Sequence, residues 1–116
     1  MITVAETTEY ARKAGKLLSE GERTELICYL AAHPDAGDVM EGTGGVRKLR
    51  WAREGRGKSG GVRVIYFFYN DGMPLYLLTI FGKNEKGNLS PGERNLLAKL
   101  TSLLVNGTGR ADGGNQ

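Results

Sequence analysis

The run from Val62 to Tyr69 constrains the fold most, because seven of its eight residues are β-branched or aromatic. Such residues favour β-strands, and the run predicts a strand in the middle of a sheet. Val46–Arg53 before it and Leu75–Phe81 after it are also extended in character, and Asn70-Asp71-Gly72 supplies a turn between the last two strands. The sequence therefore predicts a three-stranded antiparallel meander.

Side chains of a strand alternate between the two faces of its sheet, so the central strand presents two different surfaces. Arg63 lies on a face that is otherwise apolar. One interpretation is that it only extends its charged end to solvent at the strand terminus. The other is that its planar guanidinium binds a phosphate through two hydrogen bonds. The two sets of side chains are Arg63, Ile65, Phe67 and Tyr69 on one face, and Val62, Val64, Tyr66 and Phe68 on the other.

Two helices are predicted before the meander. The apolar run Ile2–Val4 is long enough for a first strand, and apolar residues recur at helical spacing from Glu6 onward. A second helix starts at Ser19, which forms a capping box with Glu22, and it ends before Pro34 because the residue preceding a proline is disfavoured in a helix. The chain from residue 34 to residue 45 is a turn-rich connector.

A final helix follows the capping box Ser90 to Glu93. Its apolar stripe, expected to pack on the sheet, consists of Leu96, Leu97, Leu100, Leu103 and Leu104. From Asn106 the composition turns to small polar residues, which predicts a disordered tail over 106–116 after one domain over 1–105. The fold class is α+β in the order β-α-α-β-β-β-α: a twisted antiparallel sheet flanked by an N-terminal helical hairpin and a C-terminal helix.

Length and composition exclude several classes of protein. A chain of 116 residues suits one domain, and it contains neither a secretory signal nor an apolar run of membrane-spanning length. We therefore expect a cytoplasmic protein without a membrane partner. Cys28 is the only cysteine and falls in an apolar helical pattern, so we expect a small core residue. His33 is the only histidine, which excludes catalysis by a histidine pair. No metal site and no cofactor is expected, because no cluster of ligands has metal-binding spacing.

The charge of the chain is concentrated in one segment. Residues 47–63 contain seven cations and one acid, a local charge of +6 in a chain of net charge +3, so the remainder carries −3. A dense cationic strip is typical of a protein that binds a phosphate backbone. Trp51 lies among these cations, either as a core residue or as a ring on which an RNA base stacks. Gly57-Lys58-Ser59 is similar to the end of a phosphate-binding loop, but Ala52 replaces the leading glycine and a strand follows instead of a helix.

Three segments in order resemble the HigB-like branch of the RelE/ParE toxin superfamily. They are residues 42–53, residues 62–66 after the glycine-rich loop, and residues 77–86. The resemblance covers about residues 2–105 and implies a RelE-like fold. It also implies a toxin of a type II toxin–antitoxin system, a metal-independent ribosome-dependent endoribonuclease (an mRNA interferase) that cleaves translated mRNA in the decoding site and arrests growth. The implied partners are the ribosome, mRNA and a cognate antitoxin, HigA-like with a helix-turn-helix domain.

The resemblance also implies which residues act. Arg63 matches the arginine of the central strand that stabilises the transition state, and Lys83 falls in the basic motif after the last strand. A lysine crowded by cations releases its proton more readily, so Lys58, Lys83 and Lys86 are candidates for the general acid or base. Glu85 is the competing base, and the choice among the four is left open. Asn84 and Ser90 depart from the best-known ribonuclease pattern, in which an arginine and a tyrosine are expected. The predicted RNA-binding residues are Arg47, Lys48, Arg50, Trp51, Arg53 and Arg56.

Two other functions are compatible with the same residues. ParE-type members of the superfamily inhibit DNA gyrase, and a non-catalytic RNA-binding module has the same electrostatics. Arg63 and the cationic strip favour the ribonuclease. Substitution of single charges separates the classes, because a binding module loses affinity in small steps over many cations, whereas an enzyme loses most of its rate at one or two positions.

Overall fold

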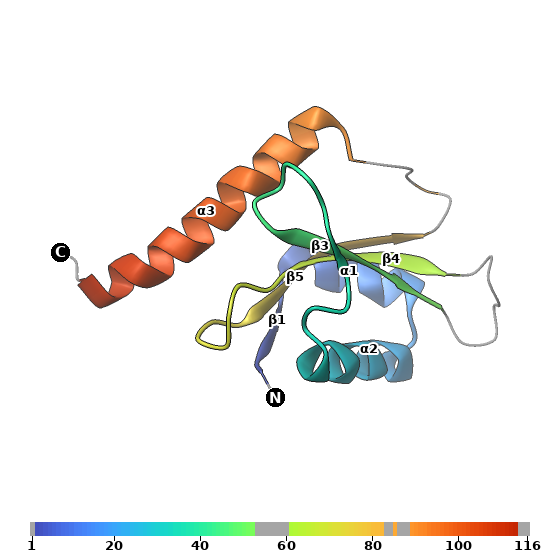
Figure 1. The fold of residues 1–116 in the computed structure, drawn as a ribbon. Coiled ribbons are helices and arrows are strands. Elements are labelled where there is room, and N and C mark those ends of the chain that lie inside the picture. The colour runs from blue at the N-terminus through green and yellow to red at the C-terminus, as the bar shows by residue number, and fades with distance from the viewer. Residues whose placement is uncertain (1, 53–60, 83–84, 86–88, 114–116) are drawn as a thin grey trace.

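The computed structural model describes residues 2–52, 61–82, 85 and 89–113, which form an α+β fold (Figure 1). The predicted element order is confirmed, with one further short strand, β2, in the connector after the second helix. Within these ranges no helix is long and apolar enough to cross a membrane. In chain order the elements are β1 (Val4–Glu6), α1 (Thr8–Leu17), α2 (Glu20–Ala32), β2 (Asp38–Val39), β3 (Val46–Trp51), β4 (Val62–Phe67), β5 (Leu75–Gly82) and α3 (Pro91–Gly113).

The sheet has the strand order β1-β5-β4-β3-β2, with β4 at its centre. The predicted antiparallel meander β3-β4-β5 is confirmed. The prediction of an antiparallel sheet throughout is wrong, because β1 pairs parallel to β5, with Val4 opposite Leu75. A parallel edge strand of three residues depends on a partner about 70 positions away, and no local pattern reveals such a pairing.

The helical hairpin α1–α2 begins at side-chain caps. Thr7 caps α1 by accepting a hydrogen bond from the Tyr10 amide, and Ser19 forms the predicted capping box with Glu22. The Ser19 hydroxyl accepts from the Glu22 amide at 3.1 Å, and the Glu22 carboxylate accepts from the Ser19 amide at 2.8 Å. Helix α2 ends at the predicted place, with His33 as its C-cap before Pro34. The two helices therefore begin and end where local chemistry requires.

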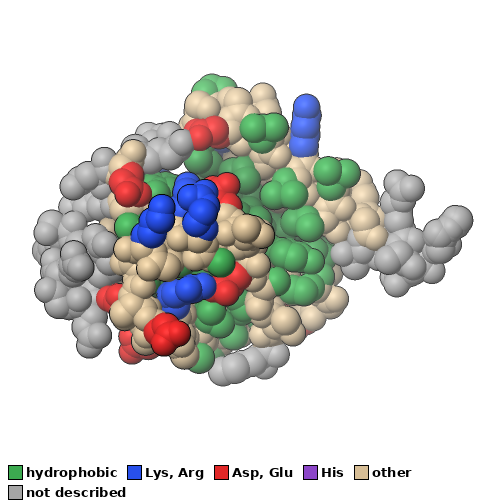
Figure 2. Space-filling view, turned by 180° about the vertical axis from the view of Figure 1, so that it is seen from behind, with side chains coloured by type: hydrophobic (Ala, Val, Ile, Leu, Met, Phe, Trp, Pro, Cys, Tyr) green, Lys and Arg blue, Asp and Glu red, His purple; other side chains and the backbone are tan. Residues whose placement is uncertain are grey.

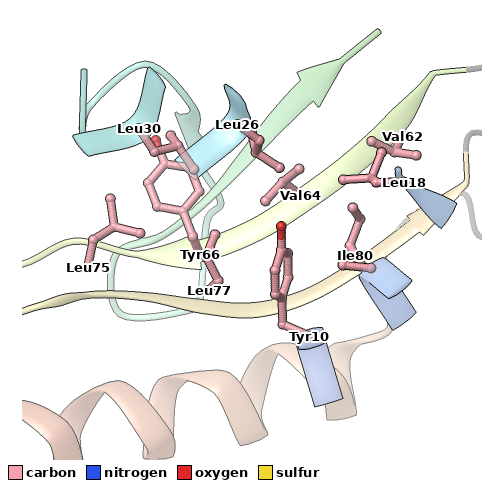
Figure 3. Close-up of a cluster of buried hydrophobic side chains, with 11 residues drawn as sticks. Tyr10, Leu18, Leu26, Leu30, Val62, Val64, Tyr66, Leu75, Leu77 and Ile80 are labelled. Atoms are coloured by element: carbon pink, nitrogen blue, oxygen red, sulfur yellow. The ribbon is translucent and has the colours of Figure 1, made fainter. Parts of the chain in front are cut away.

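The hairpin covers one face of the sheet and forms the larger core with it (Figure 3). Val62, Val64 and Tyr66 of β4 point to this side, as the alternation predicted. The Tyr66 hydroxyl donates to the Pro34 carbonyl at 2.9 Å and accepts from the Gly37 amide at 2.8 Å, so it joins the sheet to the connector after α2. Burial is the main cause that raises the pKa of Tyr66 above its ordinary value.

Helix α3 crosses the other face of the sheet, where Ile65 and Phe67 of β4 belong to a second core (Figure 1). Thr101 is buried at the crossing and donates a hydrogen bond to the Thr43 carbonyl at 3.2 Å. Gly44 lies against it with a φ of +77°, and a Cβ at this position would collide with the Thr101 hydroxyl. Glycine at this turn therefore permits both the backbone conformation and the close approach of α3.

Three details differ from the sequence predictions. Helix α3 continues to Gly113 instead of losing regular structure at Asn106, because extending an existing helix costs far less than starting one. The domain boundary at residue 105 stays a prediction. Three of the five leucines of the α3 stripe are exposed, because the sheet covers only the side of the helix that carries Leu97 and Leu104. Cys28 is exposed on α2 rather than in the core.

Candidate functional site

The cations of β3 and β4 meet on the face of the sheet that the helical hairpin leaves open. Arg50 lies directly opposite Arg63 in the antiparallel register, and Lys48 lies opposite Ile65 of the second core. Residues directly opposite each other share a face, so Lys48, Arg50 and Arg63 point to the same side. We call these three residues the cationic face.

The pairing of Arg50 with Arg63 opposes two guanidinium groups. Like charges directly opposite each other on neighbouring strands destabilise a sheet. Within the described part of the chain, neither arginine forms a salt bridge, and the hydrogen bond that Arg63 donates is a long one, 3.5 Å, to the Val62 carbonyl. Asp38 of β2 lies opposite Lys48 and is the acid nearest in register. The arrangement is suited to an anion that both guanidinium groups bind together.

The end of β5 lies beside Arg63, as the sequence predicted. Phe81 is directly opposite Arg63, and Gly82 is opposite Val62. The Glu85 carboxylate accepts a hydrogen bond from the Gly82 amide at 2.7 Å, and the Glu85 amide donates to the Gly82 carbonyl at 3.1 Å. Glu85 therefore closes the turn after β5, a structural contribution that the sequence did not reveal.

A cavity of about 210 Å³ adjoins this turn. Lys13 of α1 donates a hydrogen bond to the Thr79 hydroxyl at 3.3 Å and forms a salt bridge with Glu9 at 3.3 Å. The Thr79 hydroxyl is the main cause that lowers the pKa of Glu9, with Lys13 and Arg12 acting in the same direction and partial burial opposing them. Sequence reasoning missed this group, because α1 and β5 are far apart in the chain. The cavity is lined by Glu9, Lys13, Thr79, Phe81, Glu85, Leu89 and Glu93.

The structure separates two predicted RNA-binding residues from the cationic face. Arg47 and Trp51 alternate with Lys48 and Arg50, so they point toward the helical hairpin. One Arg47 Nη donates to the Gly37 carbonyl at 2.7 Å and to the Asp35 carbonyl at 3.2 Å. The Trp51 ring lies 5.3 Å from the Tyr29 ring, centroid to centroid. Their part in RNA binding stays a prediction.

Five of the predicted site residues lie outside the described residues. Two belong to the predicted RNA-binding strip and three to the set of candidate acids and bases. They are Arg53 and Arg56 of the strip, and Lys58, Lys83 and Lys86 of the catalytic set. Among the described residues, no group of three or more His, Cys, Asp or Glu side chains is arranged to hold a metal ion.

Fold and site together define the class: a small α+β protein in which a helical hairpin covers one face of a sheet, and helix α3 and a cationic surface share the other. Residues 8–111 match the family described as the RelE toxin of the RelE/RelB toxin–antitoxin system. The chain therefore belongs to the RelE toxin family, and its fold is RelE-like. Toxins of this family have an antitoxin as their partner.

Proposed function

We propose that the chain is a ribosome-dependent endoribonuclease of the HigB-like branch, which cleaves translated mRNA in the decoding site and so arrests translation. The observation that supports this most is the opposition of Arg50 and Arg63 on one face, with Lys48 beside them. A fold optimised only for stability avoids such a pair, so its presence favours an anionic ligand. RNA supplies that anion as a phosphodiester.

The reaction that suits this face is an internal transfer at phosphorus. The 2′-oxygen of a ribose forms a bond to the adjacent phosphorus, and the bond from phosphorus to the 5′-oxygen of the next nucleotide breaks. A general base takes the proton of the 2′-hydroxyl, and a general acid gives a proton to the departing 5′-oxygen. No metal and no cofactor takes part in this scheme. Negative charge grows on the phosphoryl oxygens, and in this proposal Arg63 stabilises it with two parallel hydrogen bonds.

The general acid and base belong to the segments on either side of Arg63. Lys58 precedes β4, and Lys83, Glu85 and Lys86 follow β5, whose last residues pair with Val62 and Arg63. Glu85 already accepts a hydrogen bond from the Gly82 amide, which favours the lysines for proton transfer. Lys48, Arg50, Arg53 and Arg56 bind the RNA backbone in this scheme.

The function is tested by inducing the chain in bacteria and mapping mRNA 5′ ends. Wild type is expected to produce cuts within translated codons, and Arg63→Ala is expected to produce none. Arg12→Ala is the matched control, because Arg12 is an exposed arginine of α1 away from β4, and it should cut like wild type. Growth arrest with intact mRNA would contradict the ribonuclease and indicate a gyrase inhibitor; RNA binding without cuts would indicate a non-catalytic module.

A further inference from the structure

Helix α3 carries a ridge of three exposed leucines. Leu96 is 67% exposed, Leu100 36% and Leu103 69%. Their spacing of four and then three residues puts them on one side of the helix, along about two turns. Single exposed leucines are common, but three in line on one helix face indicate a surface that another chain covers.

Contacts on the opposite side of α3 hold the helix in the orientation in which this ridge faces outward. Thr101 donates to the Thr43 carbonyl, and Arg94 donates to the Glu41 carbonyl. Leu97 and Leu104 pack against the second core. Rotating α3 to bury the ridge would break these interactions, so the exposure is a property of the fold. Figure 2 shows Lys and Arg side chains close to acidic ones at the centre of the view, and a stretch of hydrophobic side chains beside them.

Charge decides between two occupants of the ridge. Lys99 is exposed and flanks the ridge near its middle, three residues after Leu96 and four before Leu103. If two copies of the chain paired ridge to ridge about a two-fold axis, Lys99 would face its own equivalent, because a two-fold interface places the same patch on both sides. Glu93 is the acid at the start of the ridge, but its carboxylate already accepts a hydrogen bond from the Ser90 amide and caps α3, so it is not the partner that Lys99 needs. The charge next to the leucines therefore favours a different chain that supplies an acid.

We propose that Leu96, Leu100 and Leu103 form the docking surface for an amphipathic helix of a different chain, which places an apolar row on the leucines and an acidic side chain next to Lys99. The antitoxin partner of the family is the chain expected to carry that helix. The inference rests on the proposed function only in one respect: one of the two measurements in the test below is toxicity, which depends on that function. It places antitoxin contact on α3 and leaves the cationic face outside this contact.

The test is a double variant, Leu96→Glu with Leu103→Glu, which puts two acids on the ridge. The matched control is Gly21→Glu with Cys28→Glu: both positions are exposed and have the same spacing of seven residues, but they lie on α2, away from the ridge. Each chain is expressed alone and with the antitoxin from the same operon, and the affinity of each toxin–antitoxin pair is measured. The ridge variant should stay toxic, escape neutralisation and lose affinity by on the order of 100-fold or more, whereas the control should be neutralised like wild type.

Neutralisation and affinity unchanged in the ridge variant would overturn the proposal. A wild-type chain that sediments as a dimer, and a ridge variant that sediments as a monomer, would also overturn it, because the occupant would then be a second copy. Absence of toxicity in wild type would contradict the proposed function alone, because the affinity measurement still decides the docking surface. Equal thermal unfolding of the two double variants excludes misfolding as the cause.

Discussion

Tyr10 shows how one buried polar atom affects the whole fold. Its side chain is completely buried between α1 and the sheet, and within the described part of the chain its hydroxyl has no hydrogen-bond partner (Figure 3). Burial first, and then the charge of Glu6, raises the pKa of Tyr10 to about 12. The neutral form is favoured in the folded state, because an unpaired tyrosinate in the core would lose its hydration.

Alkaline pH should therefore destabilise the protein through Tyr10. The folded pKa lies above the unfolded value of about 10, so the contribution of the neutral tyrosine to stability is complete below pH 10. It is lost as the pH rises from about 10 to about 12. Tyr10→Phe should make the fall in the free energy of unfolding over this range less steep, as measured by urea unfolding. Tyr69→Phe is the control, since Tyr69 is half exposed; equal slopes for Tyr10→Phe and wild type would refute this account.

At the residue scale, sequence reasoning found the candidate site only in part. Alternation correctly placed Arg63 on the face opposite Val62 and Val64, and the position of the β5 end beside Arg63 was predicted. The sequence did not predict that Arg50 lies opposite Arg63, because the register of two strands depends on contacts across the loop between them. Lys13 and Thr79 came together only through the packing of α1 on β5.

At the element scale, helix boundaries follow local chemistry and strand pairing does not. Both capping boxes, at Ser19 and at Ser90, occur in the structure as predicted. A cap needs residues three positions apart, so the sequence alone contains the information. By contrast, β1 and β2 are strands of three and two residues, whose pairing depends on partners elsewhere in the sheet. The exposed side of α3 was missed for the same reason, because the width of the sheet is not a local property.

Removal of the Ser19 hydroxyl should destabilise α2 at its start. Ser19→Ala leaves the Glu22 amide without its acceptor and is expected to lower the free energy of unfolding by about 1 kcal/mol. Ser19→Thr keeps the hydroxyl and should retain most of the stability. Chemical denaturation of the two variants measures the difference. An equal loss in both would mean that the site tolerates no change of shape, rather than that the cap stabilises the helix.

At the scale of the whole molecule, the sheet divides two tasks between its faces. The hairpin side contains the larger core, with Tyr66 tying the sheet to the connector. The opposite side has an apolar end under α3 and a cationic end at Lys48, Arg50 and Arg63. The composition predicted a concentrated charge, but the segregation by face required the fold. Such a division lets cations be concentrated at one end of one face while the hairpin side and the apolar end under α3 supply the stability.

The central claim is that Arg63 stabilises the transition state of mRNA cleavage on the ribosome. The most direct measurement is single-turnover cleavage of a labelled mRNA by the purified chain, with programmed ribosomes and without them. Wild type should cleave only when ribosomes are present. Arg63→Lys, which keeps the charge but not the planar pair of donors, and Arg63→Ala should both lower the rate by about 100-fold or more. Cleavage by Arg63→Ala at the wild-type rate, or no cleavage by wild type on programmed ribosomes, would contradict the claim.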